Sequence, residues 1–175
     1  HEHTQLSHFH EVTFCYDIEK DIGYTPQQVE AMDMDDTKNI ITGTLDDLLK
    51  VGNDYVIADK KTYNGSSYKK TEPDESYVRQ LSIYRVLLHK AYGIDAKYGC
   101  LLYLDKAHDL NELPMAFELH HPEVTKEFLK ETLYELRRNP EPNPCWLCNG
   151  KNKAKKVFCP YLDQCNKEGR LEKIK

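Results

Sequence analysis

The sequence predicts an α/β domain in which a mixed β-sheet is flanked by helices. Three observations lead to this prediction. Two β-rich runs, NIITGTLDDLL and DYVIADKKT, stand on either side of a turn signal at residues 52–54. Two longer segments repeat apolar residues at helical spacing, and two further strand-like runs lie between them. Strands and helices therefore alternate along the chain.

Length and composition limit the class of protein. At 175 residues the chain is long enough for one ordinary domain with a small appended module. Its 39% hydrophobic and 30% charged residues are typical of a soluble globular protein. No apolar run approaches the roughly 18 residues that span a bilayer, so we expect a cytoplasmic protein. The net charge of -5 argues against a protein that coats nucleic acid, but it allows an enzyme that grips phosphates locally.

The first half of the chain is predicted to contain a hairpin and a helix. The segment up to about Gln28 shows a weakly helical pattern, LSHFHEVTFCYDIEK. The Gly52-Asn53-Asp54 turn then predicts a β-hairpin. Asp74 offers an N-cap for a helix from about Glu75 to Tyr92, which Gly93 ends.

The second half continues with two strands, a helix and a linker. Tyr98 to Asp105 and Met115 to His120 read as strands, and PEVTKEFLKETLYELRR reads as an amphipathic helix. The prolines of NPEPNP end that helix. We therefore expect a core over residues 1–139 and a cysteine-rich metal-binding module over residues 140–175.

The predicted hairpin carries a candidate metal site. Strand pairing through the turn at 52–54 would bring Asp46 close to Asp59, and Lys61 shares a strand face with Asp59 because side chains alternate. Two nearby carboxylates repel each other, and a divalent cation removes that cost. Hard oxygen ligands suit Mg²⁺ or Mn²⁺, and an adjacent lysine can orient water or offset charge on a phosphate. The alternative is that these are ordinary exposed charges at strand ends.

Three short motifs resemble the RecB-like branch of the PD-(D/E)XK nuclease superfamily, including its CRISPR-associated and AddB-type members. They are the GxxD of Gly43 to Asp46, the DxK of Asp59 to Lys61 and the QxxxY of Gln80 to Tyr84. The resemblance implies a restriction-endonuclease-like core and a metal-dependent DNA nuclease, with exonuclease action on single-stranded or end-containing DNA. It implies roles in DNA repair or recombination, phage replication or CRISPR adaptation, with proteins of those processes as partners. The resemblance also implies the roles of the site residues. Asp46 and Asp59 would bind the cation, and Lys61 would assist the attacking water. Gln80 and Tyr84 would support the site.

The same resemblance implies a metal-binding histidine upstream of the GxxD motif. His10 is the favoured candidate, and His8 and His1 are the alternatives. Glu30 matches an acidic position that these nucleases often carry.

Four of the six cysteines gather in the last 31 residues, which indicates a metal site in a reducing compartment rather than disulfides. Four thiolates suit either Zn²⁺ or a 4Fe-4S cluster, and the spacing does not decide between them. Cys15 is an alternative distant ligand of a cluster, and Cys100 reads as a core residue. The expected ligands are Cys145, Cys148, Cys159 and Cys165.

A basic loop within this module is a candidate for contact with nucleic acid, the alternative being a solvated surface. It holds Lys151, Lys153, Lys155 and Lys156. A competing reading of the whole chain is a non-catalytic nucleic-acid-binding or interaction module that a metal site of four cysteines stabilises.

Overall fold

The computed structural model describes residues 6–63, 72–105 and 112–138. By packing, the chain divides into one unit over His1–Glu131 and a second over Thr132–Lys175, of which only residues 132–138 are described. The expected cysteine module and its basic loop lie outside the described residues. The elements are β1 (Leu6–Asp17), β2 (Ile22–Tyr24), α1 (Pro26–Glu30), the 3-10 turn η1 (Met34–Thr37), β3 (Ile40–Val51), β4 (Asp54–Tyr63), α2 (Glu75–Tyr92), β5 (Tyr98–Asp105), β6 (Glu112–Glu118) and α3 (Pro122–Arg138).

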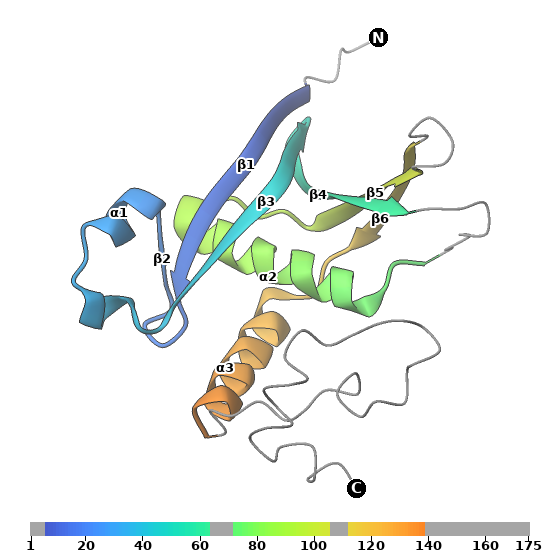
Figure 1. The fold of residues 1–175 in the computed structure, drawn as a ribbon. Coiled ribbons are helices and arrows are strands. Elements are labelled where there is room, and N and C mark those ends of the chain that lie inside the picture. Colours follow the sequence, from blue (N-terminus) through green and yellow to red (C-terminus); the bar gives the residue numbers. More distant parts are fainter. Residues whose placement is uncertain (1–5, 64–71, 106–111, 139–175) are drawn as a thin grey trace, which may run out of the picture. The chain divides into compact units, whose positions relative to one another are not determined.

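The strands form one mixed sheet in the order β2-β1-β3-β4-β5-β6 (Figure 1). The β4–β5 pair is parallel and every other pair is antiparallel. A parallel pair needs a crossover connection, and α2 lies in the connection from β4 to β5. The prediction of a mixed sheet with flanking helices is therefore confirmed.

The N-terminal segment is where the prediction of secondary structure was wrong. The weakly helical pattern belongs to β1, a strand of 12 residues that pairs with β3 along most of its length. The pattern misleads because β1 is irregular at Glu11, which has a φ of 51° and lies opposite a gap in the ladder. Phe14 and Tyr16, beyond that point, are fully buried.

The hairpin and the helix that follows it match the prediction. Gly52, with a φ of 63°, and Asn53 join β3 to β4, since Val51 pairs with Asp54. Glycine suits this position because a positive φ strains other residues. Helix α2 ends at Gly93, whose φ is 71° and whose N–H bonds the last turn, whereas Asp74 at the N-cap makes no side-chain cap bond.

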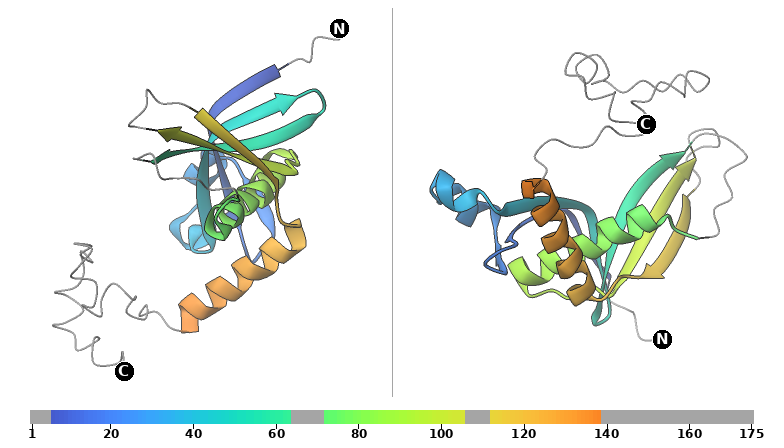
Figure 2. Two further views of the ribbon diagram at one scale, coloured as in Figure 1. Left: turned by 90° about the vertical axis from the view of Figure 1, so that its right-hand side faces the viewer. Right: turned by 90° about the horizontal axis from the view of Figure 1, so that it is seen from below.

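Helix α2 covers the sheet and supplies much of the core (Figure 2). It lies against β1, β2, β3, β4 and β5. Burial of this apolar surface is the main favourable term in folding. The largest side chains that are less than 2% exposed include Phe14, Leu45, Ile57, Leu81, Leu87, Leu88 and Leu101.

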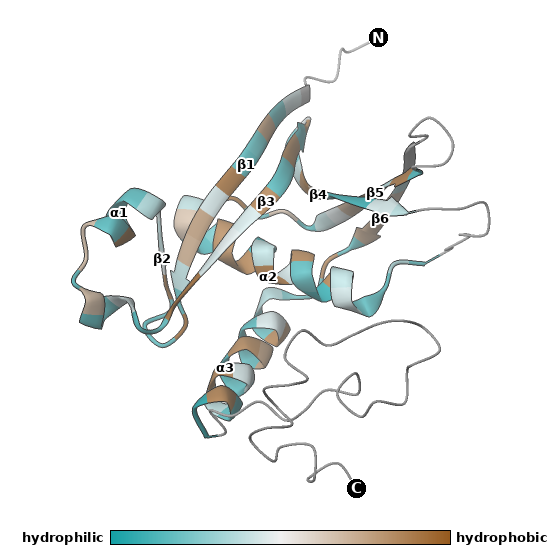
Figure 3. Cartoon of the chain, in the orientation of Figure 1, coloured by the Kyte–Doolittle hydropathy of each residue, from teal (hydrophilic) through white to brown (hydrophobic). Residues whose placement is uncertain are grey.

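The last strand and helix are displaced only slightly from the prediction. β6 begins at Glu112 rather than Met115 and includes Pro114, which is tolerated because β6 is an edge strand. Hydrophobic and hydrophilic residues alternate along α2 and α3, as expected for amphipathic helices (Figure 3). No helix among the described residues is long and apolar enough to cross a membrane.

Candidate active site

Asp46 has no partner in the β-ladders and lies where β3 and β4 separate. The β3–β4 pairing ends at Asp47 and Ala58, and the β1–β3 ladder lacks a pair at Asp46. The backbone N–H of Lys60 instead donates to Asp46 Oδ2 at 3.0 Å. The Asp46 side chain therefore reaches β4 through a hydrogen bond of its own, which fixes one carboxylate oxygen beside the DxK motif.

Asp59 and Lys61 form an ion pair one strand away. Lys61 Nζ lies 2.6 Å from Asp59 Oδ2, and Asp59 is only 5% exposed. Burial raises the pKa of Asp59, the nearby charge of Asp46 raises it further, and the Lys61 ammonium offsets only part of this. The ionised form of Asp59 is therefore disfavoured, and further positive charge nearby would stabilise it.

Helix α2 fixes the surroundings of Lys61. The ammonium lies 4.6 Å from the centre of the Tyr77 ring, which is within cation–π range. One turn further along, Gln80 Nε2 donates to the Tyr84 hydroxyl oxygen at 3.1 Å. Gln80 and Tyr84 therefore meet on one face of α2, as expected for residues at i and i+4 of a helix.

The QxxxY motif also contacts the GxxD motif. A Cβ built on Gly43 would lie 2.7 Å from Phe14 Cε2 and 3.0 Å from Tyr84 Cε1. The Phe14 and Tyr84 rings are themselves in contact, with centroids 5.5 Å apart. The glycine is therefore needed because two aromatic rings occupy the space that a side chain would fill.

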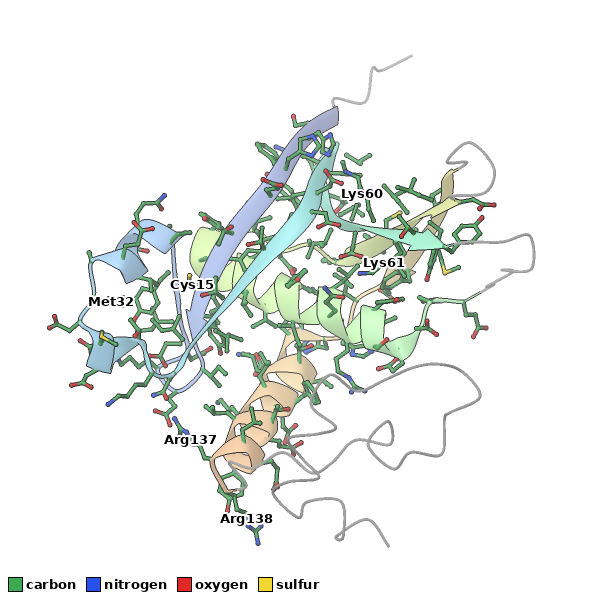
Figure 4. The ribbon with its side chains drawn as sticks, in the orientation of Figure 1. Cys15, Met32, Lys60, Lys61, Arg137 and Arg138 are labelled. Atoms are coloured by element: carbon green, nitrogen blue, oxygen red, sulfur yellow. The ribbon has the colours of Figure 1, made fainter. Side chains whose placement is uncertain are left out.

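The structure brings Asp46, Asp59 and Lys61 together, with Gln80 and Tyr84 on the neighbouring helix. His10 does not join them: its Nδ1 lies 2.5 Å from Asp47 Oδ1. Asp47 faces the same side of the sheet as its partner Ala58, and thus as Lys60. Figure 4 shows Lys60 and Lys61 on opposite sides of β4.

Two other predicted residues also lie away from these carboxylates. Glu30 is exposed at the end of α1, which follows the edge strand β2. Cys15 is buried in β1 beside Thr42, with Sγ and Oγ1 3.5 Å apart. Cys100 is half-buried rather than fully in the core, and burial raises the pKa of its thiol.

Two features of this region were not found from the sequence. The contact of the Tyr77 ring with the Lys61 ammonium was not predicted. The second feature is the cluster of His8, His10, Asp47 and Lys60. The two histidines are 37 or more positions from Asp47 in the sequence, and only the pairing of β1 with β3 brings them together. The one local signal was the spacing of His8 and His10, which places both on one face of a strand.

The carboxylates of Asp46 and Asp59 fit a hard divalent cation. Asp46 and Asp59 supply oxygen ligands. Burial and, to a smaller extent, the Asp46 charge raise the pKa of Asp59, and a cation between the two carboxylates would stabilise the ionised form. Mg²⁺ and Mn²⁺ prefer such ligands and keep several waters. Asp46 and Asp59 are the residues that would hold the ion.

Comparison with known proteins gives one family match. The sequence pattern of the PD-(D/E)XK nuclease superfamily matches residues 2–166. No curated protein sequence matches this chain. Among solved structures, the crystal structure of SSO0001 is similar, with 21% identity and a TM-score of 0.47 over 87% of this chain and 60% of that chain. This chain thus spans three fifths of the length of that protein.

Proposed function

The chain belongs to the PD-(D/E)XK nuclease superfamily, and we propose that it is a metal-dependent deoxyribonuclease of the RecB-like branch. The observation that carries this proposal is the convergence of Asp46, Asp59 and Lys61 at the point where β3 and β4 part. Family membership indicates a metal-dependent nuclease; the DNA substrate and the branch are the parts we propose.

Hydrolysis adds the oxygen of one water to phosphorus and breaks one ester P–O bond. The attacking water releases one proton and the departing alkoxide takes one up. A bound Mg²⁺ or Mn²⁺ supplies positive charge that favours water as a nucleophile and neutralises the phosphate. Asp46 and Asp59 would hold that cation. Lys61 holds its ammonium beside Asp59, where it orients the attacking water or offsets the charge that grows on the phosphate oxygens.

The α2 residues act by positioning. Tyr77 lies against the Lys61 ammonium and limits where it can point. Tyr84 is held by Gln80 and packs on Gly43, so it links α2 to the strand that carries Asp46. Their substitution is expected to misplace the charged groups rather than remove one, and small displacements are costly in catalysis.

Substrate and pathway form the finer part of the proposal. Action on single-stranded or end-containing DNA as an exonuclease is proposed from the resemblance of the motifs. A role in repair, recombination, phage replication or CRISPR adaptation rests on the same resemblance. A zinc ion or a 4Fe-4S cluster in the cysteine module is likewise proposed, with Cys145, Cys148, Cys159 and Cys165 as ligands.

The test is cleavage of end-labelled DNA, single- and double-stranded, linear and circular, with Mg²⁺, Mn²⁺ or EDTA. We expect cleavage of linear DNA with either cation, none with EDTA and none by Asp59→Asn. Resistance of circular DNA would support exonuclease action, and its cleavage would replace that part of the proposal with an endonuclease. If no substrate is cut under any condition, the proposal is wrong and the non-catalytic reading is favoured.

A further inference from the structure

A second cluster of ligand-type side chains lies where β1 and β3 pair near the start of the chain. It consists of His8, His10 and Asp47, whose ligand atoms all lie within 4.8 Å of one another. His8 Nε2 is 2.7 Å and His10 Nδ1 is 2.5 Å from the same oxygen, Asp47 Oδ1. The proposed nuclease mechanism uses none of these three residues.

The strand register explains why these groups converge. His10 pairs directly with Asp47, so their side chains share a face of the sheet. His8 stands two residues before His10, and residues at i and i+2 of a strand point the same way. The two imidazole rings consequently lie side by side, with centroids 3.8 Å apart.

The carboxylate of the cluster is buried and its two histidines are exposed. The Asp47 side chain is 2% exposed, whereas those of His8 and His10 are 41% and 61% exposed. An ion and its remaining water ligands can therefore reach the carboxylate from solvent. The carboxylate itself is held in place because Asp47 is paired with β1 on one side and with β4 on the other.

Lys60 orients the carboxylate. Its ammonium lies 2.7 Å from Asp47 Oδ2, on the oxygen that the histidines do not contact. Metal-binding carboxylates are commonly held in this way by a second hydrogen bond. The Lys60 charge opposes a cation, but the side chain is 46% exposed, so solvent screens much of that repulsion.

We propose that His8, His10 and Asp47 form a second metal site, separate from the pair of Asp46 and Asp59, for a first-row transition metal ion such as Zn²⁺. Two imidazole nitrogens and one carboxylate oxygen are ligands that Zn²⁺ takes, whereas Mg²⁺ prefers oxygen alone. Three protein ligands leave one tetrahedral position for water.

The distances are compatible with such an ion. Ligand atoms about 2.0 to 2.1 Å from a tetrahedral Zn²⁺ lie about 3.3 Å from one another. The two nitrogen–oxygen distances would have to lengthen by less than about 1 Å, and the exposed histidine side chains are free to rotate by that amount. The ion would tie β1 to β3 at Asp47, which shares a face of the sheet with Lys60 rather than with Lys61. The proposal does not depend on nuclease activity.

The experiment is equilibrium dialysis of the full chain against Zn²⁺, followed by elemental analysis. We expect the His8→Ala/His10→Ala double variant to bind one Zn²⁺ fewer per chain than the unmodified protein. Any ion on the four C-terminal cysteines is common to both proteins and cancels in the comparison. His89→Ala, an exposed histidine of α2, is the matched control and should bind as the unmodified chain does.

Two further measurements keep the test decisive. Zn²⁺ should raise the Tm of the unmodified protein by more than that of the double variant, because an ion that binds only the folded state stabilises it. If the double variant does not fold, as judged by circular dichroism, each single histidine variant should lower the Zn²⁺ affinity at least about tenfold. Equal stoichiometry and equal affinity in unmodified and histidine-substituted proteins would overturn the proposal.

Discussion

The contact of Gly43 with two aromatic rings makes a sharp prediction about Gly43→Ala. The added Cβ would meet Phe14 Cε2 at 2.7 Å and Tyr84 Cε1 at 3.0 Å. Both are shorter than the about 3.5 to 4.0 Å at which carbon atoms attract each other. Either the rings or β3 must move, and overpacking of this kind costs about 1 to 3 kcal/mol.

Thermal and urea denaturation measure that cost. A change of 1 kcal/mol shifts the Tm of a chain of this size by about 2 to 4 °C, so we expect Gly43→Ala to lower the Tm by several degrees. Thr44→Ala is the matched control, because Thr44 is exposed and its side chain, among the described contacts, bonds only the Thr13 hydroxyl. Its effect should stay within about 0.5 kcal/mol.

A double-mutant cycle tests the reason for the effect. Phe14→Leu removes the ring atom nearest to the new Cβ, so Gly43→Ala should cost less in that background. If Gly43→Ala costs the same with Phe14 or Leu at position 14, or costs no more than Thr44→Ala, the steric argument is refuted.

Three other predictions test the packing, the electrostatics and the basic loop. Gly23→Ala should destabilise the fold more than Gly43→Ala in urea denaturation, because its Cβ would overlap the Lys90 backbone, which cannot rotate away as a side chain can. An equal or smaller loss would contradict this. Hydrogen bonds from Arg85, at 2.7 and 3.2 Å, lower the pKa of Asp95, so the ionised carboxyl stabilises the fold above its unfolded pKa and loses this effect as the pH falls through the folded value. Asp95→Asn should accordingly lower the Tm at pH 7 and have a smaller effect below the usual carboxyl pKa of 3.8, and a loss that is independent of pH would refute the linkage. Neutralising Lys151, Lys153, Lys155 and Lys156 together should lower the affinity for DNA and its salt dependence. The cleavage rate at saturating DNA should not change. Unchanged affinity would mark this basic segment as a solvated surface.

Local signals made much of the sheet and α2 predictable. The Gly52 turn, the alternation in VIADKK and the closing Gly93 each act within a few residues, and each has the predicted effect in the structure. β1 was misread because its irregularity at Glu11 breaks the two-residue alternation that identifies a strand.

The candidate site was predictable in part, for the same physical reason. Strand alternation correctly placed Lys61 with Asp59, since both lie on one strand. It did not predict how Asp46 reaches them, because that contact is a hydrogen bond from the Lys60 backbone where the β3–β4 ladder has ended. The partner of His10 was also hidden, since Asp47 reaches it only through the long-range pairing of β1 with β3.

Two adjacent lysines of β4 allow a direct test of whether Lys61, with Asp46 and Asp59, forms the hydrolytic site. Lys61 pairs with Asp59 and faces Tyr77, whereas Lys60 pairs with Asp47 on the other side of the strand (Figure 4). The measurement is the cleavage rate of linear DNA at saturating Mn²⁺ for Lys61→Ala and Lys60→Ala, with folding verified by circular dichroism. We expect a loss of about a hundredfold or more for Lys61→Ala, the size typical of removing one group that stabilises developing charge. Lys60→Ala should retain most of the activity, because its backbone N–H still holds Asp46. Equal rates for the two folded variants would show that Lys61 has no special role in hydrolysis.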